Sequence, residues 1–216
     1  MIQIECLTVG PFQSNCYIVS CSQTGEAIVV DAGDEAERIL SVVRERGVSV
    51  KAIVNTHAHL DHVGALSAVK SALKVPVFMH RNELPIYEIV EAQAAMFGLP
   101  APGMVEIDRL LADGELIEVG DLTAEVVLAP GHSPGSICLW FRAEVPPQVI
   151  VGDVLFQGSI GRTDLPGASH EAMIDTLRTR IVPMPDDTIV HSGHGPVTTI
   201  GQEKRTNPFV VPLVGR

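Results

Sequence analysis

The chain has 216 residues, 46% of them hydrophobic, and a formal net charge of −11. A strongly acidic chain is poorly suited to nucleic acid or to an anionic membrane, because both partners need a basic surface. The chain also lacks an uninterrupted run of about 18 apolar residues, the length that a transmembrane helix requires. We therefore expect neither nucleic acid nor a membrane as a partner.

Short apolar runs in the first half predict strands, with helices between them. The expected strands cover residues 2–9, 16–20, 27–33, 51–57 and 75–80. Residues 34–47 carry apolar side chains at helical spacing and end at Gly47, which predicts an amphipathic helix. Two more helices are expected over 64–73 and 82–98, the second beginning at Asn82 and ending at Gly98. We assign Met96 and Phe97, just before a Pro/Gly loop, to the core rather than to a pocket wall.

The second half repeats this alternation. The expected strands cover residues 114–120, 122–132, 136–142, 148–156 and 187–195. Helices are expected over 169–181, where Ser169 is the cap, and over 199–207. Mixed strand and helix order is typical of a layered α/β or α+β architecture. We predict one domain over residues 1–216.

Four cysteines, at positions 6, 16, 21 and 138, form no C-x-x-C pair. The N-terminal segment alternates like a strand and lacks the basic and apolar regions of a secretory signal. We therefore expect a cytoplasmic protein whose cysteines are reduced and buried rather than joined in disulfides.

Unusual polar residues follow the apolar runs of four expected strands. His57, His132, Asp153 and His194 each stand at or just after such a run. Functional sites are often built where loops leave the ends of strands on a rigid sheet. We therefore expect these four residues to contribute to one site.

The densest of these segments is "THAHLDH", residues 56–62. In an extended or turning chain His57 and His59 point the same way and can chelate one ion. A tight turn then directs Asp61 and His62 to the other side, although Asp61 could instead cap the following helix. His132 and His194 could complete the two half-sites, with Asp153 as a bridging carboxylate.

Imidazole and carboxylate ligands suit zinc, iron or manganese. Two metal ions about 3.5–4 Å apart could hold a bridging hydroxide as nucleophile and polarise a carbonyl or phosphoryl oxygen. The pattern therefore predicts metal-dependent chemistry, with zinc as the preferred ion and iron or manganese as alternatives.

The segments "THAHLDH", "PGHSPGS", "GDVLF" and "SGHGP" resemble the metallo-β-lactamase superfamily. With "FQGSIGRTDLPG" and "RTNPF", the chain is most similar to short glyoxalase II-like hydrolases. The resemblance implies a four-layer αβ/βα sandwich with the site at one edge of its two sheets. It also implies the ligand sets: His57, His59 and His132 for the first metal, Asp61, His62 and His194 for the second, and Asp153 as the bridge.

The chain departs from this pattern at several points. The C-terminal helical domain that contacts glutathione in full-length glyoxalase II is missing, and "GRTD" stands where a lysine and a tyrosine usually lie. Arg162 could keep the cationic role toward substrate, while Asp164 replaces the aromatic hydroxyl. Lactamases commonly carry a cysteine ligand where this chain has Asp153, which argues against β-lactam hydrolysis.

The expected function is hydrolysis of a thioester, S-D-lactoylglutathione or a similar acyl-thiol, by attack of a metal-bridging hydroxide, with Asp61 orienting that nucleophile. "GRTD" also resembles the persulfide dioxygenases, so a mononuclear-iron dioxygenase is the alternative. A metal-binding module without chemistry is a third class, disfavoured because no ligand of the set is lost. The sequence leaves the oligomeric state open.

Overall fold

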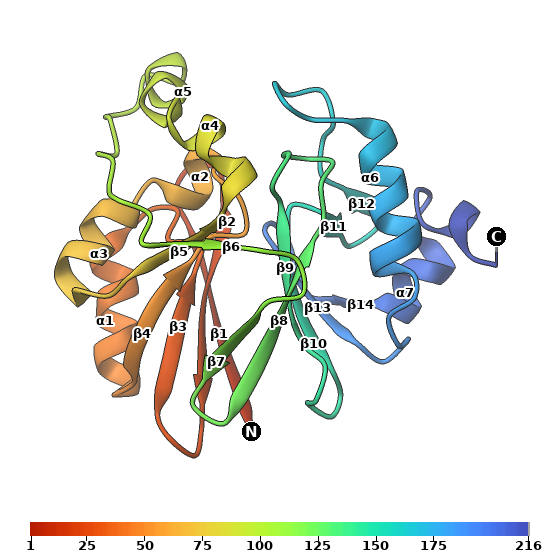
Figure 1. Cartoon of the computed structure of the whole chain (residues 1–216), viewed down its shortest axis with the longest axis horizontal. Helices are drawn as coiled ribbons and strands as arrows, with labels where there is room; N and C mark the ends of the chain where they lie inside the picture. The colour runs from red at the N-terminus through yellow and green to blue at the C-terminus, as the bar shows by residue number, and fades with distance from the viewer. Residues whose placement is uncertain (216) are drawn as a thin grey trace. The chain divides into compact units, whose positions relative to one another are not determined.

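In this computed structural model, which describes residues 1–215, the chain divides into two compact units. The first unit comprises Met1–Leu111 and the short segment Glu118–Thr123. The second comprises Ala112–Ile117 and the chain from Ala124 onward. Both units contain a sheet and helices (Figure 1), which confirms the predicted mixed α/β class.

The first unit is built on a six-stranded sheet in the order β1-β2-β3-β4-β5-β6. These strands are β1 (Ile2–Val9), β2 (Ser14–Cys21), β3 (Glu26–Val30), β4 (Ser49–Val54), β5 (Val77–His80) and β6 (Arg109–Leu111). The β1/β2 and β2/β3 pairs are antiparallel, and the remaining pairs are parallel. Because β3 and β4 run in parallel, the segments that follow them leave the sheet at the same edge.

The helices of the first unit bury their apolar faces in one core with this sheet. They are α1 (Ala36–Arg46), α2 (Leu60–Val63), α3 (Leu66–Leu73), α4 (Leu84–Tyr87) and α5 (Val90–Met96), and the short 3-10 turn η1 (Arg81–Glu83) precedes α4. As predicted, α1 ends at Gly47, which adopts the left-handed conformation (φ 63°) that glycine tolerates best. Ile39, Leu40 and Val43 are its buried face.

The helix predicted over 82–98 is wrong as a single element. It is divided into η1, α4 and α5, with a break after Tyr87. The cap at its start is His80, whose Nδ1 accepts a hydrogen bond from the Asn82 amide, and not Asn82 itself. Pro85 lies in the first turn of α4, where its missing N–H is tolerated. Because proline is not accommodated in a helix interior, η1 and α4 do not form one continuous α-helix.

The second unit has a six-stranded sheet in the order β14-β13-β10-β9-β8-β7. These strands are β7 (Leu116–Val119), β8 (Leu122–Leu128), β9 (Ile137–Phe141), β10 (Gln148–Gly152), β13 (Ile189–Ser192) and β14 (Thr198–Thr199). A separate hairpin joins β11 (Leu155–Phe156) to β12 (Ser159–Ile160). Strands β10 and β13 are parallel, so Asp153 and His194 follow strands that end at one edge.

The strand predicted over 148–156 is interrupted at Gly152. This residue has φ 50°, a left-handed conformation that turns the chain out of β10 immediately before Asp153. The helices of this unit are α6 (His170–Thr176), the π-helical turn η2 (Leu177–Ile181), α7 (Ile200–Thr206) and η3 (Val211–Leu213). Ser169 caps α6 as predicted, since its Oγ accepts a hydrogen bond from the Ala172 amide.

Three further sequence predictions can be compared with the structure. Cys16, Cys21 and Cys138 are buried free thiols, but Cys6 is exposed on β1, where alternate side chains face solvent. Met96 and Phe97 are largely exposed and do not belong to the core. Within residues 1–215, no helix is both long and apolar enough to cross a membrane. The single domain over 1–216 stays a prediction.

Candidate metal centre

The turn that follows β4 gathers three imidazoles within the first unit. The ring centroids of His57 and His59 lie 4.9 Å apart, and those of His57 and His62 lie 4.1 Å apart. His57 and His62 are buried, and His59 is half-buried. Burying imidazoles so close together is unfavourable unless they are paired or bind a metal. The short distances between these rings show the predicted clustering of the three histidines.

Asp31, which the sequence analysis did not select, lies beneath this cluster. It follows β3, and its Oδ2 lies 3.0 Å from Nδ1 of His62. The same carboxylate accepts hydrogen bonds from the amide and hydroxyl of Thr56. The Thr56 hydroxyl oxygen in turn lies 3.1 Å from Nδ1 of His57. One buried carboxylate thus orients two histidines, one directly and one through a hydroxyl.

These contacts fix which ring nitrogens are available for a metal. Since Nδ1 of His62 faces Asp31 and Nδ1 of His57 faces Thr56, each ring presents Nε2 away from those partners. Ligand atoms of Asp31, His57 and His62 all lie within 4.8 Å of one another. A carboxylate behind a metal-binding imidazole sets its tautomer and increases its basicity, so this arrangement suits metal binding through Nε2.

Backbone amides between these candidate ligands are held by two side chains from the helical segment 81–96. The Ala58 amide donates to Oε2 of Glu83 at 2.8 Å, and the Leu60 amide donates to Oε1 of Gln93 at 3.1 Å. Glu83 is fully buried. Ala58 and Leu60, whose amides are hydrogen-bonded, alternate along the chain with the candidate ligands His57, His59 and Asp61. These hydrogen bonds give the turn a defined conformation before any ion binds.

Asp61 lies in the first turn of α2, whose cap is His59, so the alternative role of Asp61 as a helix cap is wrong. Its Oδ2 lies 3.6 Å from Nε2 of His62, the same nitrogen that points away from Asp31. Ser14 on β2 fixes the backbone here by donating from Oγ to the Asp61 carbonyl at 2.6 Å. The carboxylate and imidazole of this pair are placed to share one ion.

The second unit brings together His132, Asp153 and His194. Oδ2 of Asp153 lies 3.5 Å from Nε2 of His132 and 3.5 Å from Nε2 of His194. A single carboxylate oxygen is therefore equidistant from two imidazole nitrogens. A carboxylate oxygen in this position can bind a metal ion together with either histidine.

His132 is oriented by a backbone group rather than a carboxylate. Its Nδ1 lies 2.9 Å from the carbonyl oxygen of Arg162, which leaves Nε2 facing Asp153. The backbone at Gly161 passes very close to that of Asp153. A Cβ on Gly161 would lie 1.9 Å from the Asp153 carbonyl oxygen, so only glycine fits. The segment "GRTD" thus contributes to the site through its main chain.

The side chain of Arg162 is exposed and forms a bidentate ion pair with Asp164, with Nε–Oδ1 and Nη2–Oδ2 distances of 2.7 and 2.8 Å. This pairing lowers the pKa of the Asp164 carboxyl and raises that of the guanidinium. Asp164 therefore holds the conformation of this loop through its ion pair with Arg162. Nη1 of Arg162 is not used in the pair, and its edge can approach a substrate.

A fully buried carboxylate, Glu203 on α7, anchors the β11–β12 hairpin that follows Asp153. It accepts hydrogen bonds from the Gly158 amide, the Thr198 hydroxyl and Nδ2 of Asn207. Asn207 Nδ2 also donates to the Ser159 carbonyl. The hairpin carries Phe156, whose ring centroid lies 6.0 Å from that of His194.

The three remaining histidines have other environments. His80 caps η1, and His170 is exposed at the start of α6. His191 has Nε2 2.7 Å from Oε1 of Gln148, and burial lowers its pKa to about 4. It is a core histidine of β13.

Sequence reasoning missed Asp31, Glu83 and Glu203. Asp31 ends the apolar run "AIVVD" and therefore has the same strand-end position as the four residues that were selected. That position was a usable signal. Glu83 and Glu203 lie among exposed-looking polar residues on short helices, and nothing in the local pattern distinguishes them.

Comparison with known proteins assigns the chain to a family. Residues 9–194 match the family model described as the Metallo-beta-lactamase superfamily. Hydroxyacylglutathione hydrolase GloC of Haemophilus influenzae is 39% identical over 216 residues, covering 97% of this chain and 98% of the relative.

Two solved structures are similar over nearly the whole chain. BLEG-1 B3 metallo-beta-lactamase has a TM-score of 0.89 at 37% identity, covering 96% of this chain and 99% of its own. TTHA1623, solved in a di-iron-bound form, has a TM-score of 0.86 at 40% identity, covering 95% and 99%.

The fold and the histidine and carboxylate clusters define a metal-dependent hydrolase of the metallo-β-lactamase fold. The chain belongs to the metallo-β-lactamase superfamily. The fold type predicted from its motifs is thereby confirmed.

Proposed function

We propose that the chain hydrolyses a thioester, S-D-lactoylglutathione or a similar acyl-thiol, at a site that holds two divalent metal ions. The observation that carries the proposal is the position of Asp153 Oδ2, 3.5 Å from the Nε2 atoms of both His132 and His194. The similarity to hydroxyacylglutathione hydrolase GloC along 97% of the chain supports the choice of substrate.

The proposed ligands divide into two sets with one bridge. His57, His59 and His132 hold the first ion, Asp61, His62 and His194 hold the second, and Asp153 bridges them. The donor set fits metal binding: it consists of imidazoles and carboxylates without a cysteine, which suits zinc, iron or manganese. The Nδ1 contacts of His57, His62 and His132 support coordination through Nε2.

When bound, such ions polarise a carbonyl oxygen and lower the pKa of a water molecule toward neutrality. The chain itself must position that water and the substrate. Asp61, partly exposed beside His62, can accept a hydrogen bond from the water and aim it at the thioester carbon. The leaving thiolate has a solution pKa of about 8.5, so it departs without a strong general acid. This fits the absence of any further acid from the proposed set.

Arg162 is proposed to bind a carboxylate of the thiol carrier through its Nη1 edge. Asp164 holds the opposite edge and so pre-orients the guanidinium. The test is a comparison of Arg162→Ala with Arg142→Ala, since Arg142 is also exposed and paired with a carboxylate. Only Arg162→Ala should raise KM for a glutathione thioester, and equal KM values in the two variants would contradict this role.

The experiment for the whole proposal joins metal analysis to three assays. We expect about two ions per chain and anaerobic hydrolysis of S-D-lactoylglutathione. One iron per chain, with oxygen consumed on glutathione persulfide, would instead support the alternative, a mononuclear-iron persulfide dioxygenase. Faster hydrolysis of a β-lactam than of any thioester would also overturn the proposal, which matters because a similar structure is named a B3 metallo-beta-lactamase.

The proposed partners are limited to this small-molecule substrate, without nucleic acid or a membrane, as the net charge of −11 favours. We propose a cytoplasmic location because all four cysteines are free thiols.

A further inference from the structure

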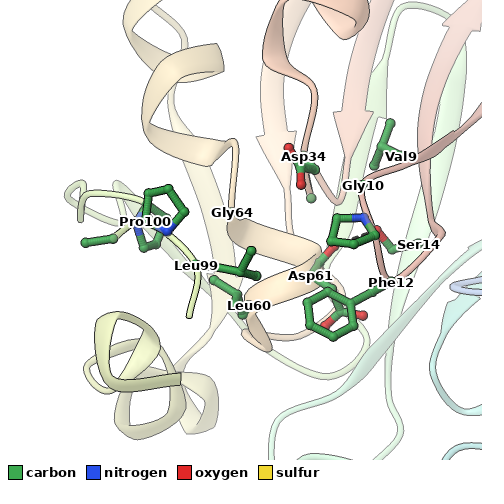
Figure 2. A pocket seen from close by; sticks show the side chains of 14 residues that line it. Val9, Gly10, Phe12, Ser14, Asp34, Leu60, Asp61, Gly64, Leu99 and Pro100 are labelled. Carbon is green, nitrogen blue, oxygen red and sulfur yellow. Dashed lines mark hydrogen bonds between the residues drawn. The ribbon is translucent and has the colours of Figure 1, made fainter. Parts of the chain in front are cut away.

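A cavity of about 270 Å³ lies within the first unit, beside Asp61. Its walls come from the β1–β2 turn, the loop after β3, helix α2 and the segment 99–102 (Figure 2). The volume is below the roughly 300–1,000 Å³ of sites that enclose a whole drug-sized ligand. The cavity is therefore suited to one part of a substrate rather than to all of it.

The lining of this cavity presents polar and apolar surface in about equal shares and contains no basic side chain. Phe12, Leu60 and Leu99 contribute apolar surface, and the only acidic residues are Asp34 and Asp61. Glutathione carries two carboxylates, which carboxylate side chains without a nearby cation would repel. The apolar surface of Phe12, Leu60 and Leu99 instead suits an uncharged, apolar group.

The cavity is joined to the proposed metal centre through the backbone of Asp61. Ser14 on one wall donates to the Asp61 carbonyl, and a Cβ on Gly33 would lie only 1.9 Å from that oxygen. The loop after β3 and the first turn of α2 are thus in direct contact. If the acyl group of a thioester occupies this cavity, its carbonyl carbon lies close to Asp61, which is proposed to orient the attacking water.

The walls of the cavity are fixed by contacts outside it. The Leu60 amide is held by Gln93 of α5, and the Phe12 and Phe97 rings meet edge to face with centroids 5.0 Å apart. Phe97 is exposed at the end of α5, and this contact explains what its ring does there. These contacts hold the Leu60 and Phe12 walls of the cavity in place.

We propose that this cavity binds the acyl group of the substrate, and that the enzyme prefers thioesters whose acyl chains are longer and more apolar than lactoyl. The inference rests on the proposed thioesterase function and specifies its substrate class. In the reaction water adds to the carbonyl carbon and the C–S bond breaks, giving a carboxylate, a thiol and a proton. The acyl chain stays in the cavity while the thiol carrier leaves from the other side of the carbonyl.

The test is a series of glutathione thioesters with lactoyl, propanoyl, butanoyl and hexanoyl groups, assayed with the full-length, metal-loaded enzyme. Each added methylene buried in the cavity should raise kcat/KM about fourfold. Lactoyl, whose hydroxyl gives it less apolar surface to bury than propanoyl, should fall at or below propanoyl. A flat series, or one that falls with chain length, would overturn the inference while leaving the thioesterase proposal intact.

A cavity-filling variant locates the effect. Ala101 lines the cavity from an exposed segment, so Ala101→Trp should lower kcat/KM for hexanoyl about tenfold or more. Its effect on propanoyl should be less than about threefold. Ala143→Trp is the control, since Ala143 is also exposed but belongs to the second unit. Equal loss for both acyl groups in Ala101→Trp would contradict the assignment.

The two proposals fail in different ways. If no thioester of the series is hydrolysed with zinc, manganese or iron, the proposed function itself is wrong. If thioesters are hydrolysed without the chain-length trend, only the acyl cavity is wrong. The series on the unmodified enzyme decides this even if Ala101→Trp does not fold.

Discussion

Asp31 Oδ2 lies 3.0 Å from Nδ1 of His62, and both side chains are almost fully excluded from solvent. The two residues are separated by 31 positions in the chain and meet because β3 and β4 pair in parallel. Asp31 has φ 55°, a left-handed conformation that aspartate tolerates better than most residues. The turn after β3 therefore carries some strain in order to place this carboxylate under the histidines.

Replacing Asp31 with asparagine should weaken metal binding without removing a proposed ligand. The amide cannot accept both the Nδ1 proton of His62 and the two hydrogen bonds from Thr56. Loss of such a supporting carboxylate typically lowers metal affinity about 10–100-fold. Competition with a chelator of known affinity measures this, and Asp121→Asn, on an exposed turn of the same unit, is the matched control. Unchanged metal affinity in folded Asp31→Asn would show that Asp31 supports the fold alone.

Removing the proposed bridge should have a larger effect. In Asp153→Ala we expect metal content and thioester hydrolysis to fall together, because each proposed ion loses a ligand at the same time. Asp187→Ala, an exposed carboxylate in the same unit, should retain both. Metal content is measured after gel filtration in metal-free buffer. Normal loading of Asp153→Ala would refute the bridging role.

The strand-end residues were predictable because each is a rare residue type after an apolar run. His57, His132, Asp153 and His194 all follow strands of the structure. The groups that orient them were harder to find. His132 is oriented by the main-chain carbonyl of Arg162, and a main-chain contact cannot be inferred from residue types. The Arg162 side chain was selected from the sequence for a different role, substrate binding. Asp31 becomes visible only when the strand order places β3 beside β4.

The prediction of helix boundaries was wrong where local helix preference and tertiary contacts disagree. Residues 82–98 have the apolar spacing of one helix, yet the chain breaks after Tyr87. Glu83 and Gln93, on either side of that break, both reach backbone amides of the histidine turn. The break lets the segments that carry Glu83 and Gln93 take different directions, so that each side chain reaches its own amide. Such demands arise from packing and leave no local trace in the sequence.

Glu203 should be among the most destabilising residues to truncate in the second unit. In Glu203→Ala three donors lose their acceptor: the Gly158 amide and the buried Thr198 hydroxyl and Asn207 amide group. We expect the free energy of unfolding to fall by about 3–5 kcal/mol. Glu91→Ala is the control, because Glu91 is an exposed glutamate also in a helix's first turn, and it should change stability by less than about 0.5 kcal/mol.

Urea unfolding measures both variants, and Glu203→Gln separates charge from shape. Glutamine keeps one acceptor oxygen but presents an amide to donors, so its stability should lie between those of wild type and Glu203→Ala. If Glu203→Ala unfolds at the same urea concentration as Glu91→Ala, the hydrogen bonds of Glu203 do not hold the hairpin.

His191 should make the protein less stable in mild acid. Burial lowers the pKa of its imidazole to about 4, whereas an unfolded chain has the ordinary value of 6.5. Above pH 6.5 the imidazole is neutral in both states, so its full contribution to stability is present. As the pH falls from 6.5 to 4 the unfolded state binds a proton that the folded state does not. The free energy of unfolding should therefore drop by up to roughly 3 kcal/mol across that window.

The measurement is the difference in free energy of unfolding between wild type and His191→Leu at several pH values. Leucine removes the hydrogen bond to Gln148 and so lowers stability by a constant amount at pH 7 and above. Between pH 6.5 and 4 that difference should shrink, because only wild type loses stability through this group. His170→Gln, at an exposed histidine, should give a curve parallel to wild type. Parallel curves for His191→Leu as well would mean that its imidazole titrates alike in the folded and unfolded chains.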